Sequence, residues 1–285
     1  MKVLEENCEK PDLEYLEDVF AKIFSVENIA NNIKESDIPL VEDCDISKIR
    51  EDYFYIFYFD ILGYKSKMAK YGEGNFLKII YASMEAIKES CGKKKRGYWG
   101  YYIFSDNIIV YCRKSKDAAD NMISLLNLIN KAFLMQRNLM GQYGILIRGS
   151  ITEGKLFCGG EFVFGSGLID AYNMENYKAI NPRIIIDRKV MRYINEINSV
   201  YDGLKTNICK YINEDDDGEY FIGYINNCSQ SQTMFLGYVY MHKNLITTQL
   251  EQSTLEENVY AKMLWCKKYH NYICDLYGFE ELKIK

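Results

Sequence analysis

The sequence predicts an α+β fold, an antiparallel sheet with its helices on one face, and three observations lead to this prediction. The aromatic and β-branched run at 53–60 is typical of a buried strand. Residues 75–90 and 117–140 have the apolar periodicity of helices. Strand pairs are expected at 98–112 and 144–158. The order strand, helix, strand, strand, helix, strand is that of the split βαβ, or ferredoxin-like, motif.

The first strand is expected to end in a carboxylate and a turn. The run YFYIFYFD stops at Asp60, and Gly63 interrupts the segment ILGY that follows. The next two strands, within YWGYYIFSDNIIVYC (98–112), are expected to meet at Ser105-Asp106-Asn107, because Ser, Asp and Asn favour tight turns. Asp106 therefore lies at a predicted hairpin tip.

In the split βαβ topology the end of the first strand and this hairpin come together, so Asp60 and Asp106 should be neighbours. Two carboxylates beside a glycine turn are natural ligands for Mg²⁺ or Mn²⁺, which take oxygen ligands and keep positions open for phosphate. The plainer alternative is that Asp106 only favours its turn and Asp60 only ends its strand. The spacing alone leaves both interpretations open.

The remaining elements of this part follow directly. The segment 117–140 carries one apolar helical stripe, formed by Met122, Leu125, Leu126, Ile129 and Phe133. The segment GILIRGSITEGKLFC (144–158) is expected to form a second hairpin, with its turn at Glu153-Gly154.

Composition excludes several classes of protein. The chain has 285 residues, 48% hydrophobic and 26% charged, which is typical of a globular protein, and its net charge of −5 gives no general attraction to nucleic acid. The basic cluster at 93–96 is interpreted as a solvated turn. Two His and nine Cys without a C-x-x-C pair leave little material for a zinc site, and they indicate reduced thiols in a cytoplasmic protein. No apolar run approaches the roughly 18 residues of a membrane span.

Three segments are expected along the chain. Residues 1–50 form a helical leader, residues 51–187 the central domain, and residues 188–285 an appendage with two strands and a long final helix from about 254 to 277. The acidic run EDDDG (214–218) between the two strands is interpreted as a solvated hairpin loop. On the final helix, His270 is expected to be half-buried and satisfied, whereas His242 has no visible partner.

Four blocks, FDILGY (59–64), FSDN (104–107), IRGSITEGKLF (147–157) and VFGSGLIDAYNME (163–175), resemble in order and spacing the signature blocks of class III nucleotide cyclases. The resemblance implies the palm fold of that family and two Mn²⁺ or Mg²⁺ ions. It implies that Asp60, Asp106 and the backbone carbonyl of Ile61 bind metal. It further implies that the backbone amides of Leu62, Gly63 and Tyr64 hold the triphosphate, and that Arg148 is a catalytic arginine.

The departures from the family pattern concern the base and the transition state. The positions at which adenylate cyclases recognise adenine fall on Tyr102 and Phe162, and neither residue reproduces that recognition. The transition-state Asn and Arg of the family correspond to Ile169 and Asn173. Another cation is therefore expected near the α-phosphate, and Arg148, Arg183 and Arg188 are the candidates.

These departures, together with the short forms of the blocks, resemble the pyrimidine cyclases of bacterial Pycsar anti-phage systems. The segment AKMLWCKKYHNY (261–272) also resembles the closing helix common in that group. The resemblance implies conversion of UTP, in preference to CTP, to the 3′,5′-cyclic monophosphate and pyrophosphate, with a cyclic-nucleotide effector activated by the product. It also implies a head-to-tail homodimer with composite active sites.

Two alternatives stay open at the level of sequence. A catalytically inactive cyclase-homology module that binds nucleotide or only dimerises would explain Ile169 and Asn173, although the retained pair Asp60 and Asp106 counts against it. A polymerase-like or diguanylate cyclase palm shares the topology, but a G-G-D-E-F-like turn is absent at 104–108.

Overall fold

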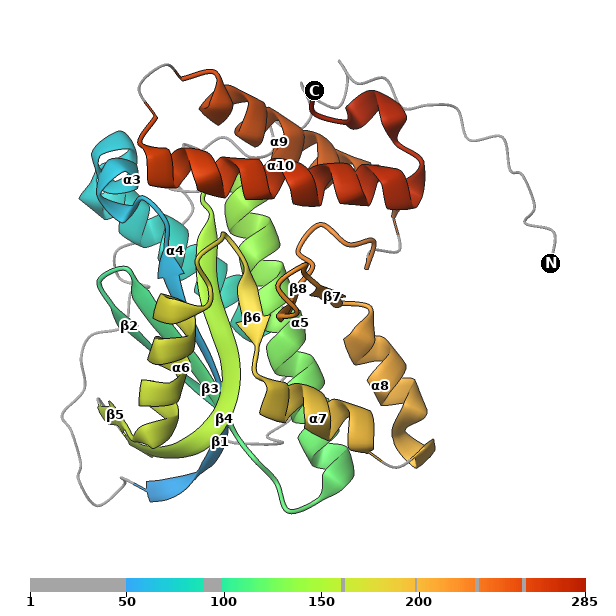
Figure 1. The fold of residues 1–285 in the computed structure, drawn as a ribbon. Helices are drawn as coiled ribbons and strands as arrows, with labels where there is room; N and C mark the ends of the chain where they lie inside the picture. The colour runs from blue at the N-terminus through green and yellow to red at the C-terminus, as the bar shows by residue number, and fades with distance from the viewer. Residues whose placement is uncertain (1–49, 90–98, 160–161, 198, 229–230, 253–254) are drawn as a thin grey trace, which may run out of the picture.

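The computed structural model describes residues 50–89, 99–159, 162–197, 199–228, 231–252 and 255–285. The predicted leader and the basic cluster at 93–96 lie outside the described residues. Figure 1 shows the chain, whose first elements are β1 (Arg50–Ile61), α3 (Tyr64–Tyr71), α4 (Glu73–Glu89), β2 (Trp99–Phe104), β3 (Asn107–Arg113), α5 (Ala118–Tyr143), β4 (Ile147–Gly159) and β5 (Phe162–Phe164). The later elements are α6 (Ser166–Tyr177), β6 (Ile184–Ile186), α7 (Arg188–Glu196), η3 (Ser199–Tyr201), α8 (Asp202–Cys209), β7 (Ile212–Glu214), β8 (Tyr220–Ile222), α9 (Gln232–Leu250), α10 (Glu257–Tyr277) and η4 (Glu280–Leu282).

The strands form one sheet of eight strands within the described residues, in the order β2-β3-β1-β4-β6-β8-β7, with β5 paired to β4. Strands β2, β3, β1 and β4 pair antiparallel, which is the order of the split βαβ motif. The pairing of β4 with β6 is parallel, so the sheet as a whole is mixed. The predicted α+β class and ferredoxin-like core are therefore confirmed.

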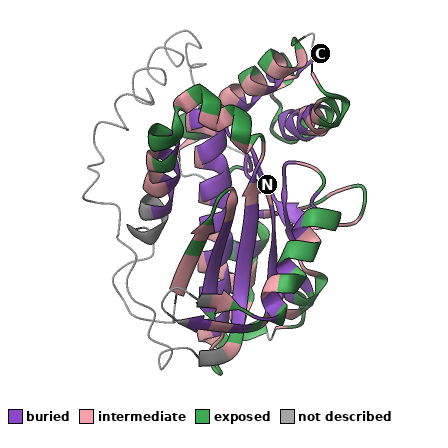
Figure 2. Cartoon of the chain, turned by 90° about the vertical axis from the view of Figure 1, so that its left-hand side faces the viewer, coloured by how far each residue is buried: buried purple, intermediate pink, exposed green. Residues whose placement is uncertain are grey.

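Side chains alternate between the two faces of β1, and each face has its own covering layer. Tyr55, Phe57 and Phe59 join the large core with α4 and α5, so these two helices share one face as predicted. Ile56 and Tyr58 point to the other face, where α6 packs. Figure 2 shows the buried residues filling the strands and the helix sides turned toward them.

The predicted hairpin turn at Glu153-Gly154 is wrong, because β4 runs without a break from Ile147 to Gly159. Gly154 serves a packing contact instead. A Cβ atom on Gly154 would lie 2.5 Å from the Cα of Gly167 in α6, so the glycine lets the helix approach the strand. A glycine within a strand can mark either a turn or a close packing contact, and the pattern of a single sequence does not distinguish the two.

The segment after residue 187 continues the same sheet. Strands β8 and β7 extend it beyond β6, and Val190, Ile194 and Ile208 join the large core. Helices α9 and α10 form a second core with residues that include Leu146 and Ile185. Figure 1 shows this helix pair lying across the end of the sheet where β1 ends and β4 begins. None of the helices within the described part of the chain has the length and hydrophobicity needed to cross a membrane.

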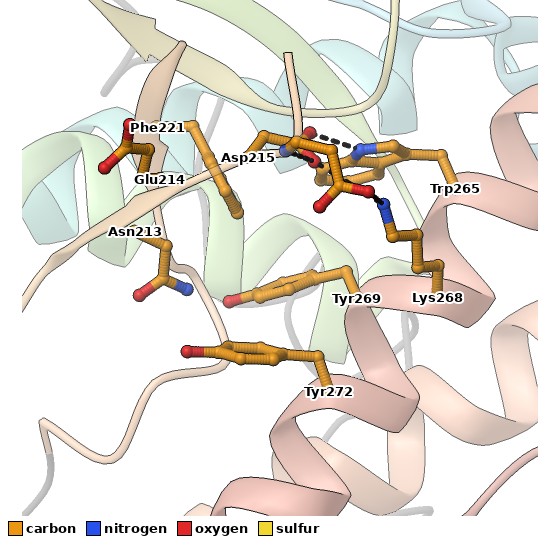
Figure 3. Close-up of a pocket in the computed structure, with 9 residues that line it drawn as sticks. Asn213, Glu214, Asp215, Phe221, Trp265, Lys268, Tyr269 and Tyr272 are labelled. Atoms are coloured by element: carbon orange, nitrogen blue, oxygen red, sulfur yellow. Dashed lines mark hydrogen bonds and ion pairs between the residues drawn. The ribbon is translucent and has the colours of Figure 1, made fainter. Parts of the chain in front are cut away.

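The acidic loop 214–218 does more than a solvated hairpin loop would. Its carboxylates Asp215 and Asp217 pair with the guanidinium of Arg183, which is only 1% exposed. Asp215 also accepts a hydrogen bond from the indole Nε1 of Trp265 at 2.7 Å, beside a pocket of about 140 Å³ (Figure 3). The prediction missed this role because the partner, Arg183, is distant in sequence.

Both histidines are completely buried, so the half-buried expectation for His270 is wrong. His270 is satisfied as predicted, through Nε2 and the carbonyl of Leu282 at 2.9 Å. His242 has partners after all: its Nε2 lies 2.9 Å from the hydroxyl of Tyr224, and its Nδ1 lies 3.3 Å from Nδ1 of His270. Both side chains belong to the packed interior around α9 and α10, and this burial lowers the pKa of both imidazoles.

Candidate active site

One row of polar residues crosses the sheet at the end of β1. In register, Asn107 of β3 is paired with Asp60 of β1, and Asp60 with Arg148 of β4. Phe104 of β2 extends the row on the other side of Asn107. By alternation from Ile56 and Tyr58 the row lies on the face that α6 covers. Strand pairing therefore places the carboxylate of Asp60 beside the guanidinium of Arg148.

The β2–β3 turn brings Asp106 next to this row. Ser105 adopts the left-handed conformation, with φ 57°, which a short polar residue tolerates. The carbonyl of Asp106 accepts the amide of Ile61 at 3.2 Å, and Nδ2 of Asn107 donates to Oδ1 of Asp106 at 3.2 Å. Asp60 and Asp106 are therefore neighbours, as the topology predicts.

Glu175 of α6 is the acidic residue that sequence reasoning missed. The Nε atom of Arg148 lies 2.7 Å from Oε1 of Glu175 and 3.3 Å from Oδ2 of Asp60, so one guanidinium stands between two carboxylates. Glu175 is 3% exposed. The signal in the sequence is its helical spacing: Gly167, Ala171 and Glu175 follow one another at four-residue intervals and are the buried residues of α6.

The local environment raises the pKa of both carboxyls. Burial raises the pKa of Asp60, the ion pair with Arg148 opposes that shift, and the charge of Asp106 adds to it. Burial raises the pKa of Glu175 to about 7, with Arg148 opposing the rise and Asp60 and Asp106 adding to it. The site therefore concentrates negative charge that a cation would relieve.

The turn after β1 leads directly into a helix. Gly63 adopts φ 69° and caps the N-terminus of α3, where a residue with a side chain would be strained. The amide of Leu62, one of the three predicted phosphate donors, donates to the carbonyl of Leu146 at 2.9 Å. Gly63 and Tyr64 stand at the helix N-terminus, where backbone amides and the helix dipole favour anions.

The residues predicted to contact the base and the transition state lie on three different elements, β2, β5 and α6. Tyr102, 37% exposed, lies on the α6 face one row away from Asp60, in register with Ile109. Phe162 begins β5, but its side chain lies outside the described residues. Ile169 and Asn173 are both exposed on α6. Each of these assignments stays a prediction.

Of the three candidate cations, only Arg148 lies at the carboxylates. The guanidinium of Arg183 is buried against Asp215 and Asp217, on the β7–β8 loop. Arg188 is exposed and lies 3.9 Å from Glu219.

The donor chemistry fits a hard divalent cation. Among the described residues, no three His, Cys, Asp or Glu side chains are grouped so that they could hold a metal ion by themselves. Asp60, Asp106 and the carbonyl of Ile61 offer only oxygen, and a Mg²⁺ or Mn²⁺ ion bound through two carboxylates completes its shell with water and phosphate oxygens.

No family model and no curated protein matches the chain. Among solved structures it is similar to the adenylyl cyclase CyaB from P. aeruginosa, with a TM-score of 0.41 and 14% identity over 53% of this chain and 84% of that one. It is also similar to the guanylyl cyclase domain of the RhoGC fusion protein from the aquatic fungus Blastocladiella emersonii, with a TM-score of 0.40 and 16% identity over 61% of this chain and 97% of that one. The catalytic core of a rhodopsin-guanylyl cyclase with converted specificity gives a TM-score of 0.43 and 16% identity over 61% of this chain and 98% of that one. The chemistry of the site therefore rests on the residues of this chain.

Proposed function

We propose that the protein is a nucleotide cyclase that converts a pyrimidine nucleoside triphosphate, UTP in preference to CTP, to its 3′,5′-cyclic monophosphate. The observation that carries the proposal is the meeting of Asp60 and Asp106 beside the Gly63 turn and the N-terminus of α3. Carboxylates for metal and amides for phosphate then lie at one end of the sheet.

In this reaction the ribose 3′-hydroxyl oxygen forms a bond to the α-phosphorus, and the bond from that phosphorus to the bridging oxygen of the β-phosphate breaks. Pyrophosphate leaves, and the hydroxyl proton passes to water. Asp60, Asp106 and the carbonyl of Ile61 would hold the metal, which when bound lowers the pKa of the hydroxyl and neutralises phosphate charge. Arg148 holds Asp60 and Glu175 in place, and the fixed site orients a nucleophile and a phosphate of the same molecule.

The pyrimidine preference is supported by the residue types at two positions of the sequence. Tyr102 and Phe162 occupy the sequence positions at which purine recognition would be expected, and aromatic side chains suit a smaller base. The product would act as a second messenger in anti-phage defence, through an effector with a cyclic-nucleotide sensor.

The test is incubation of the purified chain with Mn²⁺ and each of the four nucleoside triphosphates, with the product identified by mass spectrometry. We expect cyclic UMP, and loss of activity with a chelator that added Mn²⁺ reverses. Asp60→Ala and Asp106→Ala should each lower kcat by about a hundredfold or more, because each carboxylate would hold the metal that stabilises the negative charge of the transition state.

The matched control is Asp216→Asn, an exposed carboxylate on the β7–β8 loop, which should retain full activity. A purine product would overturn the base assignment alone. If no triphosphate were cyclised and Asp106→Ala changed nothing, the proposal of a cyclase would be wrong.

One observation favours a second candidate, a module that binds nucleotide without turnover: Oδ2 of Asp60 already accepts a hydrogen bond from Nε of Arg148 at 3.3 Å. Calorimetric titration with UTP and Mn²⁺ separates the two. Binding together with turnover supports the cyclase, and binding without turnover supports the module.

A further inference from the structure

A pocket of about 480 Å³ lies at the end of the sheet, beside the turn that follows Asp60. One wall is the turn after β1 and the helix that follows it, with Gly63, Lys67 and Lys70. The opposite wall is α9 and α10, with Lys262 among the lining residues. The volume falls within the range of roughly 300–1,000 Å³ that small-molecule sites occupy.

The pocket is strongly basic. Among the described residues, three lysines line it, against the one carboxylate of Glu256. Burial lowers the pKa of Lys67 to about 8, and the neighbouring charge of Lys70 contributes to the shift. Ammonium groups held close enough to repel one another, beside the N-terminus of α3, form an environment that favours a polyanion.

Lys262 connects this pocket to the carboxylates. It is partly buried and interacts electrostatically with Asp60, Glu175 and Arg148 as well as lining the pocket. Within the described part of the chain its ammonium group makes no ion pair, unlike Lys268 on the same helix, which pairs with Asp216. A lysine at this position faces both the metal-binding carboxylates and the phosphate side of the pocket.

Packing of α10 against the end of the sheet fixes the position of Lys262. Met263, the next residue, is buried in the core that α9 and α10 form with Leu146 of the segment leading into β4. The helix is therefore fixed against the end of the sheet, and Lys262 extends from a fixed backbone position.

We propose that α9 and α10 form the outer wall of the phosphate site and that Lys262 binds the triphosphate chain of the substrate, in the same polypeptide as Asp60. This inference rests on the proposed function for the identity of the substrate, and on the pocket for the polyphosphate chemistry. Lys67 and Lys70 bind the same triphosphate from the opposite wall of the pocket. The C-terminal helices then complete the active site rather than only bracing the domain.

The experiment measures binding of inorganic pyrophosphate by calorimetry, with Mn²⁺ present, to the full chain and to Lys262→Gln. We expect the substitution to weaken binding by about tenfold or more, the usual effect of losing one charge-assisted contact. Lys262→Arg should recover part of the affinity, and Lys268→Gln, on the side of α10 that contacts the β7–β8 loop, should bind as wild type does (Figure 3).

A second measurement uses the unaltered chain. Lys262, which lines the pocket, should react with an amine-specific reagent, and pyrophosphate should protect it while Lys268 stays reactive, as mass spectrometry of the peptides would show. Equal affinity in Lys262→Gln, or absence of protection, would overturn the assignment.

The outcomes separate this inference from the proposed function. If pyrophosphate binding depends on Lys262 but no triphosphate is cyclised, the site stands and the cyclase proposal fails. If cyclic nucleotide is produced and Lys262→Gln keeps the wild-type KM, kcat and pyrophosphate affinity, the cyclase stands and this assignment fails.

Discussion

At the scale of single residues, the buried carboxyl of Glu175 is the most unusual group of the site. It lies on the packed side of α6, and its ion-pair partner among the described residues is the Nε atom of Arg148 at 2.7 Å. Its burial favours the neutral form, whereas the guanidinium favours the charged form, and burial is the larger effect. The proton affinity of Glu175 is therefore tied to the folded state.

This linkage predicts a pH dependence of stability. The pKa of Glu175 is about 7 in the fold against an ordinary 4.5, so the folded state binds the proton more tightly. The resulting stabilisation is fully present below about pH 4.5 and is lost as the pH rises through about 7. Over that window the free energy of unfolding of the wild type should fall relative to Glu175→Gln by up to about 3 kcal/mol.

Urea unfolding followed by circular dichroism at a series of pH values measures this difference. Glu257→Gln, an exposed carboxyl at the start of α10, is the matched control and should show a pH profile parallel to the wild type. Parallel profiles for Glu175→Gln as well would contradict the pKa assigned to this carboxyl.

At the scale of elements, the contact of α6 with β4 decides where Glu175 and Ile169 stand. Gly154 and Gly167 face each other so closely that neither has room for a side chain. The hydroxyl of Ser150 donates to the carbonyl of Ala171 at 2.7 Å and fixes the helix along the strand. The helix reaches the strand because small residues line both sides of the contact.

Gly154→Ala is therefore expected to lower the free energy of unfolding by about 1–3 kcal/mol, because the added methyl group collides with the backbone of α6. Thermal or urea unfolding measures the loss. Gly203→Ala in α8 is the control, since nothing lies within 4 Å of its added Cβ atom and alanine favours a helix. Equal stability of the two variants would show that the close approach of α6 and β4 is not required.

At the scale of the whole molecule, the side of the sheet that α6 covers exposes several large apolar residues. Phe104, Ile169 and Tyr172 are 69%, 59% and 47% exposed. Apolar side chains gathered on one side of a protein mark an interaction surface. Phe104 lies in the same row as Asp60 and Tyr172 packs against Tyr58, which fits the predicted homodimer, in which this side of one chain would complete the site of the other.

We expect the chain to sediment as a dimer, and Ile169→Asp to weaken that dimer by at least about tenfold, because a charge would be buried in an apolar contact. Leu77→Arg, an equally apolar but exposed position on α4 at the other side of the sheet, should leave the dimer intact. Sedimentation velocity distinguishes these results. A wild-type chain that stays monomeric at concentrations at which it is active would refute the composite site.

Much of the fold could be predicted because its elements have local signatures. The aromatic run that ends at Asp60, the turn at Ser105-Asp106 and the apolar stripe of α5 each lie within one short stretch of sequence. Errors arose where one residue type serves two purposes. Gly154 resembled a turn residue and is a packing residue, and the loop 214–218 resembled a solvated loop and holds the buried Arg183.

The sequence by itself determined the order of strands and helices from about residue 53 to 140 and the two carboxylates at the end of the first strand and in the next turn, and it offers only two histidines. Only the tertiary structure decided that Arg148 stands between Asp60 and Glu175, and that Lys262 of the last long helix lies at the same end of the sheet. The physical reason is the range of the interactions. Backbone preferences act over a few residues, whereas the charges of the site come from β1, β4, α6 and α10 and meet only when the core has brought those elements together.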